Sequence, residues 1–171
     1  MAIDRRSRSV HLAVKDDETE ASARAFLEEA VRAFPFRVTR VLTDRGSCFT
    51  ADGFEKACRA LDLEHRKTRP YTPRTNGMAE RFNGRVQREV LGITVAGHRD
   101  LERLLAGFNA AYNARRQRVL GGRSPDEAVR ERLARDRDLA NPTYRPPPDP
   151  CVVPKALLVV ERAKDVSRPD S

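Results

Sequence analysis

The sequence lacks the features of a membrane-spanning or exported protein. No apolar run approaches the roughly 18 residues that a membrane-spanning helix needs. The first ten residues, MAIDRRSRSV, lack the apolar core of a signal peptide. Both absences predict a cytoplasmic protein with no membrane partner. The length of 171 residues suits about one domain with a short appendage.

Cysteine is scarce and offers no clear disulfide framework or zinc site. Cys48, Cys58 and Cys151 are odd in number and widely spaced, and no histidine stands near them at zinc-ligand spacing. We therefore expect ordinary or buried thiols, with no disulfide and no zinc.

Lysine is also scarce, although the chain is strongly basic. The net charge is +8, from 33 Lys and Arg against 25 Asp and Glu, and only 5 of the basic residues are lysine. Such a balance suits a polyanionic partner, of which nucleic acid is the usual example. Arginine binds phosphate better than lysine does, but a GC-rich genome gives the same bias. Composition alone therefore leaves DNA binding open.

Strands and helices alternate in the first part of the predicted structure. The pattern predicts strands at 8–14, 38–43 and 63–67, separated by an amphipathic helix at 19–34 and a second helix from about residue 52. Before them, Met1-Ala2-Ile3 resembles the end of an apolar strand followed by a turn. This alternation is typical of a layered α/β fold.

The second part is predicted to be helical, after a loop at 68–77. Helices are expected at about 78–91, 99–114 and 124–136, the last beginning with the cap, proline and glutamate of Ser124-Pro125-Asp126-Glu127.

A proline-rich segment follows, with 6 prolines in the 14 residues NPTYRPPPDPCVVP. Such a segment is an extended, semi-rigid connector. We therefore divide the chain into a core at 1–138 and a C-terminal extension at 139–171.

A single acid, Glu80, stands among basic and amide residues in PYTPRTNGMAERFNG, residues 70–84. If the helix begins after Asn76-Gly77, Glu80 lies in its first turn, where an acid favours the helix dipole and can close a capping box. The expected buried face is formed by Ala79, Phe82, Val86 and Val90. Glu80 and Asn83 project from another side of the helix. Glu80 therefore has one of two roles: a structural one at the helix start, or a chemical one at a site.

A second acid, Asp44, directly follows the strand at 38–43. Ligand sites of open α/β sheets gather at the carboxyl ends of strands, although an Asp also commonly starts a turn. Magnesium takes a few carboxylate oxygens together with waters and substrate phosphate. Two such ions, about 3.5–4 Å apart, can clamp the attacking and leaving oxygens of a phosphodiester.

Two sequence blocks carry a family resemblance. LTDRGSCFT (42–50) and PYTPRTNGMAERFNG (70–84) resemble the signature blocks of retroviral-type integrases and related bacterial insertion-sequence transposases. That family uses an Asp-Asp-Glu triad with 35 residues between the second Asp and the Glu, and 35 residues separate Asp44 from Glu80. YNARRQRVLGGRSPDEAV (112–129) is similar to the transposase branch. The resemblance covers about residues 1–135.

The resemblance implies a ribonuclease-H-like α/β fold, with a mixed five-stranded sheet flanked by helices. Asp44 then corresponds to the second catalytic Asp and Glu80 to the catalytic Glu, and both hold Mg²⁺ or Mn²⁺. Pro73 and Gly77 fall, with Tyr71, on the mobile loop that meets the DNA end in this family. The residues expected to contact DNA are Tyr71, Arg74, Asn76, Arg81, Asn83 and Arg85. For Asn83, a solvated position on the helix is an equal alternative.

The chain departs from the family pattern at its start. MAIDRRSR matches the family segment VAxDxxSR, so Asp4 corresponds to the non-catalytic Asp before Ser-Arg. We therefore expect the family's first catalytic Asp, its first strand and the upstream helix-turn-helix region to be missing from this chain.

The leading hypothesis is the C-terminal part of a DDE transposase core, which joins transposon ends to target DNA by metal-dependent strand transfer. Its expected partners are DNA and either further copies of itself or an upstream-encoded transposase segment. One alternative is a catalytically incomplete DNA-binding remnant or accessory subunit. A ribonuclease-H-like nuclease, which cleaves without joining, is another.

Overall fold

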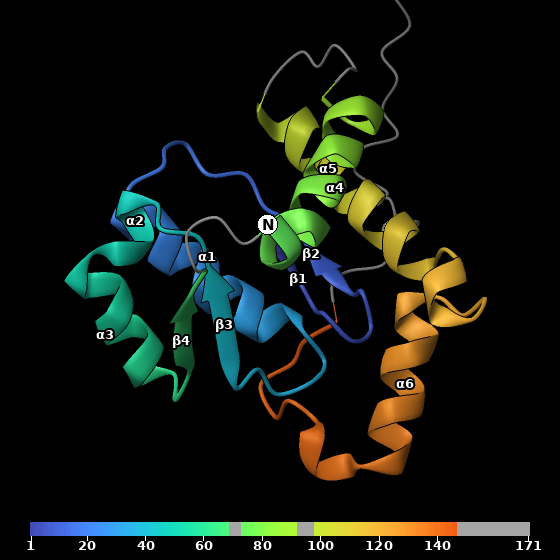
Figure 1. The fold of residues 1–171 in the computed structure, drawn as a ribbon. Helices are drawn as coiled ribbons and strands as arrows, with labels where there is room; N and C mark the ends of the chain where they lie inside the picture. The colour runs from blue at the N-terminus through green and yellow to red at the C-terminus, as the bar shows by residue number, and fades with distance from the viewer. Residues whose placement is uncertain (69–72, 92–97, 147–171) are drawn as a thin grey trace, which may run out of the picture.

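The structure is a computed structural model that describes residues 1–68, 73–91 and 98–146 (Figure 1). Short strands alternate with helices in the first part and helices dominate the second, as predicted. The elements are β1 (Ala2–Ile3), β2 (Val10–His11), α1 (Glu20–Ala33), β3 (Arg40–Thr43), α2 (Ser47–Thr50), α3 (Asp52–Ala60), β4 (Glu64–Lys67), α4 (Pro73–Glu89), α5 (His98–Ala114), η1 (Arg118–Leu120), α6 (Pro125–Arg135) and η2 (Arg137–Leu139).

The strands form two pairs. β1 and β2 make an antiparallel hairpin, and β3 and β4 are parallel, with Val41 opposite His65. The single five-stranded sheet implied by the resemblance is therefore not formed by the described residues, because none of them supplies a strand that joins the two pairs.

β2 is shorter than the strand predicted at 8–14, and its outer edge is paired with a side chain. The backbone N–H of Val10 donates to Asn113 Oδ1, and Asn113 Nδ2 donates to the carbonyl of Val10, both at 2.9 Å. The amide thus pairs with the strand edge as a neighbouring strand would, and it docks α5 on β2.

Three apolar clusters hold the elements together. The first packs α4 and α5 on β2, through Val10, Phe82, Val86, Val90 and Leu105. The second joins α1, α3 and the start of β4, through Leu27, Phe54, Cys58 and Leu63. The third joins α1 to α6, through Ala30, Phe34, Phe36 and Val129. The predicted apolar face of α4 is confirmed by the burial of Phe82, Val86 and Val90.

The predicted start of α6 is also confirmed. Ser124 is the N-cap, and its hydroxyl accepts from the backbone N–H of Glu127 at 3.2 Å. The Glu127 carboxylate in turn accepts from the backbone N–H of Ser124 at 2.7 Å, with Pro125 in the first turn. This reciprocal pair satisfies two donors that a helix start otherwise leaves without partners.

α4 begins earlier than predicted. Its first residue is Pro73, so Asn76 and Gly77 lie inside the helix and not in the loop expected at 68–77. Proline suits a first helical position because its fixed φ is helical and its missing N–H is not needed there. The helix therefore begins at Pro73, although an Asn-Gly pair commonly forms a turn.

The residues after α6 return to the body of the fold. Asn141 Nδ2 donates to the carbonyls of Val31 and Phe34, both at 2.8 Å, at the C-terminal end of α1. Phe36 also pairs with Ala140 in an isolated antiparallel bridge. Most of the proline-rich extension lies outside the described residues. No helix within the described ranges is both long enough and apolar enough to cross a membrane.

Candidate metal and DNA site

Asp44 follows the last residue of β3, as predicted, and its side chain is exposed. Its Oδ1 accepts a hydrogen bond from the backbone N–H of Gly46 at 2.9 Å. A Cβ on residue 46 would lie 3.1 Å from that oxygen, so glycine allows the close approach. Within the described part of the chain, no hydrogen bond engages the other carboxylate oxygen, Oδ2. That oxygen can therefore bind a ligand without first losing a protein partner.

Glu80 is the eighth residue of α4, roughly two turns from the helix start. It is exposed, and the first turn of α4 contains no acid. The helix-start role considered for Glu80 is therefore wrong, because the dipole effect fades within the first turn. No ion pair or hydrogen bond engages its carboxylate among the described residues.

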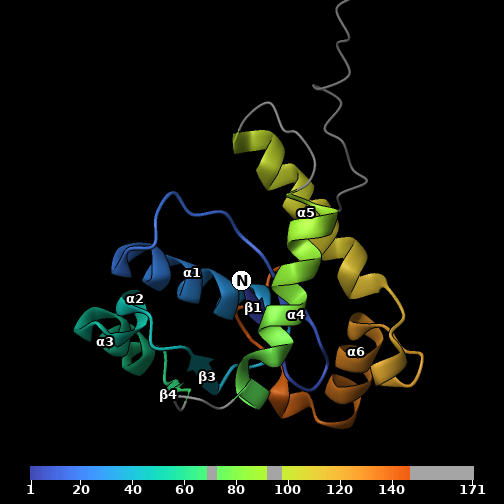
Figure 2. The same ribbon diagram turned by 45° about the horizontal axis from the view of Figure 1, so that its top comes forward.

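The first sequence block contacts the segment that leads to the second at the carboxyl ends of β3 and β4. The backbone N–H of Thr68 donates to the carbonyl of Thr43 at 2.9 Å, and Arg45 Nε donates to the carbonyl of Thr68 at 3.2 Å. Five residues after Thr68 the chain enters α4, whose first turns lie beside the ends of these strands in both views (Figures 1 and 2). Asp44 and the start of the helix that carries Glu80 therefore share one end of the strand pair.

The two predicted acids, Asp44 and Glu80, are of a type that suits magnesium. Carboxylates are the protein ligands that magnesium prefers, together with water and phosphate oxygens. Across the described ranges, no three His, Cys, Asp or Glu side chains gather into a group that could hold a metal ion. Asp4 is engaged within its own turn, where its Oδ2 accepts from both the N–H and the hydroxyl of Ser7 at 2.7 Å.

The residues expected to contact DNA have different surroundings. Arg81 and Asn83 are exposed on α4. Arg85 is engaged within the protein: its Nε lies 3.2 Å from Glu89, and its guanidinium lies 5.8 Å from the centre of the Tyr112 ring. The helical backbone of Arg74 and Asn76 is described without their side chains, and Tyr71 lies outside the described residues.

Sequence reasoning missed a buried histidine behind Asp44. The His65 side chain is 2% exposed, and its Nε2 lies 2.8 Å from the hydroxyl of Thr43. Its Nδ1 lies 2.9 Å from Glu55 Oε1. The one available signal was a histidine in the otherwise charged strand EHRK. Its partners come from β3 and α3, and no spacing in the sequence predicts that meeting.

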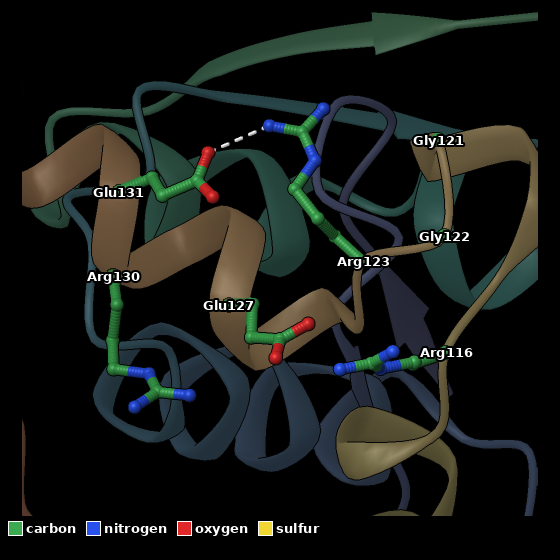
Figure 3. A pocket seen from close by; sticks show the side chains of 7 residues that line it. All are labelled: Arg116, Gly121, Gly122, Arg123, Glu127, Arg130 and Glu131. Atoms are coloured by element: carbon green, nitrogen blue, oxygen red, sulfur yellow. Dashed lines mark hydrogen bonds and ion pairs between the residues drawn. The ribbon is translucent and has the colours of Figure 1, made fainter.

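The block at 112–129 forms a hollow of about 490 Å³ beside the start of α6 (Figure 3). Two of its three arginines face glutamates: Arg123 lies 2.6 Å from Glu131, and Arg116 points toward Glu127. The backbone N–H of Ser124 is the main cause that lowers the pKa of Glu127, with Arg116 adding to it. Three arginines against two glutamates leave the lining with one excess positive charge.

Comparison with known proteins places the chain. It is 33% identical over 93 residues to Transposase InsD for insertion element IS2A/D/F/H/I/K of Escherichia coli, covering 53% of this chain and 31% of that protein. The same identity and length relate it to Putative transposase InsD for insertion element IS2E of Escherichia coli (strain K12), of which 43% is covered. The chain thus spans less than half the length of these relatives.

The fold is also that of a solved integrase core. The crystal structure of the catalytic core domain of BIV integrase matches with a TM-score of 0.64 at 22% identity, covering 79% of this chain and 86% of that one. This likeness confirms the predicted ribonuclease-H-like fold class. Two sequence profiles, each described as Integrase core domain, match residues 1–73 and 61–125. These matches together run from residue 1 to residue 125, so the chain is similar to the integrase core domain over most of its length.

Proposed function

We propose that this chain is the part of a DDE transposase core that holds divalent metal at a DNA end for phosphodiester strand transfer. The observation that carries the proposal is the state of Glu80. It is exposed near the middle of α4, away from the helix ends, and 35 residues lie between it and a second exposed acid, Asp44. The similarity to integrase core domains and to the transposase relatives supports the same assignment.

In this proposal Asp44 and Glu80 are ligands of Mg²⁺ or Mn²⁺. The metal, when bound, would polarise the phosphodiester and favour the attacking hydroxyl. The protein presents the two carboxylates, with the Asp44 oxygen oriented by the N–H of Gly46. Arg81 and Asn83 are exposed on the same helix as Glu80 and are suited to the DNA backbone, which fixes the position of the reacting strand.

A two-metal clamp usually needs a further acid, which the described residues do not bring to this site. We therefore expect the third ligand to come from another transposase segment or from a second copy of the chain. The transposon ends and the target DNA would be the substrates. Because the chain covers only part of its relatives, the activity of a whole transposase is part of this proposal.

The direct test is Mn²⁺ binding, followed by electron paramagnetic resonance of the free ion. Asp44→Asn and Glu80→Gln should each weaken binding, because each keeps the side-chain shape and removes an anionic ligand. Glu89→Gln is the matched control: this acid lies on the same helix but pairs with Arg85. Equal Mn²⁺ affinity in the parent and all three variants would contradict the metal site.

The second candidate is a DNA-binding remnant or accessory subunit. The observation that favours it is the lack of a three-ligand group among the described residues. A joining assay with Mn²⁺, transposon-end DNA and a segment that supplies a third acid separates the candidates. Joining that is lost in Glu80→Gln supports the transposase. DNA binding without joining supports the remnant, and cleavage without joining indicates a nuclease.

A further inference from the structure

A chain of hydrogen bonds runs from the surface of α3 to the residue before Asp44. Glu55 Oε1 lies 2.9 Å from His65 Nδ1, and His65 Nε2 lies 2.8 Å from the Thr43 hydroxyl. That hydroxyl is also 2.9 Å from the carbonyl oxygen of Asp44. The chain therefore ends on the backbone of a proposed metal ligand.

The protons in this chain can be assigned from its chemistry. Lys67 Nζ lies 2.9 Å from the same Glu55 oxygen, and its hydrogen bond is the main cause that lowers the pKa of Glu55. The carboxylate is thus ionised and only accepts, so His65 Nδ1 carries a proton. When Nε2 carries no proton, the Thr43 hydroxyl donates to it; when Nε2 is protonated as well, it donates to the hydroxyl, which in turn donates to the Asp44 carbonyl. In both arrangements one hydrogen bond ties the end of β3 to the ring.

The His65 ring is held in place by packing against an aromatic side chain. His65 meets Phe54 edge to face, with ring centroids 5.1 Å apart, and Phe54 is 1% exposed in the centre of its cluster. Asp44, by contrast, is exposed, and its carboxylate is held only by the N–H of Gly46 within the described structure. The direction of that carboxylate therefore depends on how firmly the backbone at Thr43 is held.

We propose that His65 is a positioning residue for Asp44. Through the Thr43 hydroxyl it fixes the end of β3, and Glu55 fixes the ring, so that the Asp44 carboxylate is presented to a divalent ion in one direction. Partners behind a ligand commonly orient it in this way. This inference rests on the proposed function, because it takes Asp44 as a metal ligand.

The test uses two variants of Thr43, one without and one with the hydroxyl, and one variant of each of two histidines. Thr43→Val removes the hydroxyl and keeps the shape of a strand residue, whereas Thr43→Ser keeps the hydroxyl. His65→Gln removes the ring. His11→Gln is the matched control, because His11 Nε2 makes a similar contact with Glu29, at 3.1 Å, in another part of the fold.

Two readouts are measured on each variant and on Asp44→Asn: Mn²⁺ affinity, and the amide chemical shift of Gly46, whose N–H reports the Asp44 oxygen directly. We expect about tenfold weaker Mn²⁺ binding and a shifted Gly46 amide in Thr43→Val and His65→Gln. Thr43→Ser and His11→Gln should retain the parental values. If His65→Gln does not fold, the Thr43 pair decides alone, since both variants keep the ring.

The outcomes separate this inference from the proposed function. A Gly46 amide that is unchanged in Thr43→Val, or equally shifted in Thr43→Ser, overturns the positioning role. If Asp44→Asn binds Mn²⁺ as the parent does, the metal assignment fails, and the Gly46 amide then decides whether Thr43 and His65 position the carboxylate. Thr43→Val with a shifted amide but parental Mn²⁺ affinity would overturn the link between position and metal binding.

Discussion

At the scale of single residues, Gly46 is the position where an added Cβ would disturb the Asp44 carboxylate. Its φ of −55° suits any residue, so the backbone does not require glycine. A Cβ, however, would lie 3.1 Å from Asp44 Oδ1 and 3.5 Å from the Phe49 ring. We expect Gly46→Ala to displace the Asp44 carboxylate and to weaken Mn²⁺ binding, with little change in the free energy of unfolding. Metal titration and chemical denaturation measure the two effects.

Gly107→Ala is the control for this prediction. Residue 107 lies in α5, and a Cβ there would meet nothing within 4 Å. This variant should raise the free energy of unfolding by about 0.5–1 kcal/mol, because alanine favours a helix over glycine, and it should leave Mn²⁺ binding unchanged. Parental Mn²⁺ affinity in Gly46→Ala would show that the tight turn does not orient the ligand.

The residues of the candidate site were predictable to different degrees. Asp44 and Glu80 could be proposed from the sequence because the blocks that carry them are continuous, and the end of a strand can be located from a short apolar run. The hydrogen bonds of His65 could not be predicted in this way. Its hydrogen bonds join three elements, and the partner of a buried polar group depends on how those elements pack.

At the scale of elements, α6 depends on a charge that acid removes. The backbone N–H of Ser124 is the main cause that lowers the pKa of Glu127 below its ordinary value of 4.5. A lowered folded pKa adds stability above the unfolded pKa, and this stability is lost as pH falls through the folded value. We therefore expect Glu127→Gln to unfold more easily than the parent at neutral pH, with the difference closing in acid. Denaturant titrations across this pH range measure it.

Ser124→Ala separates the cap from the charge. It removes the hydroxyl that accepts from the N–H of Glu127 but leaves the backbone N–H that binds the carboxylate. The loss should be about 1 kcal/mol of unfolding free energy, and the pH dependence due to Glu127 should remain. A stability difference between the parent and Glu127→Gln that does not change with pH would contradict the assigned cause.

The elements also show where local signals succeed. The cap, proline and glutamate at the start of α6 lie within four residues, so they were sufficient to locate it. The short helix α2 was not predicted, because turn residues precede it and no apolar period marks it. Pairing between strands depends on distant segments, so the sequence did not reveal that the described strands form two separate pairs.

At the scale of the whole molecule, Asn141 joins the end of the described chain to α1. Its Nδ2 satisfies two carbonyls at the C-terminal end of that helix. We expect Asn141→Ala to lower the free energy of unfolding by about 1–2 kcal/mol, since both acceptors lose their donor. Asn141→Asp should cost more, because it turns an acceptor with negative charge toward the negative end of the helix dipole. Urea denaturation of the three proteins tests this order, and an Asp variant as stable as the parent would refute it.

Because the net charge of +8 belongs to the whole chain, we expect the proposed DNA binding to involve much of the surface, although one residue can be tested at the site. Binding through phosphates releases counterions, so the affinity should fall steeply with salt, with a logarithmic slope of about −0.9 for each phosphate neutralised. Arg81→Gln should make that slope shallower by about one unit, because Arg81 is exposed beside Glu80. Arg135→Gln, an exposed arginine in the last turn of α6, should leave the slope unchanged. Fluorescence anisotropy at several salt concentrations gives these slopes. Binding that does not depend on salt, or equal slopes in the two variants, would show that α4 does not present its arginine to the DNA backbone.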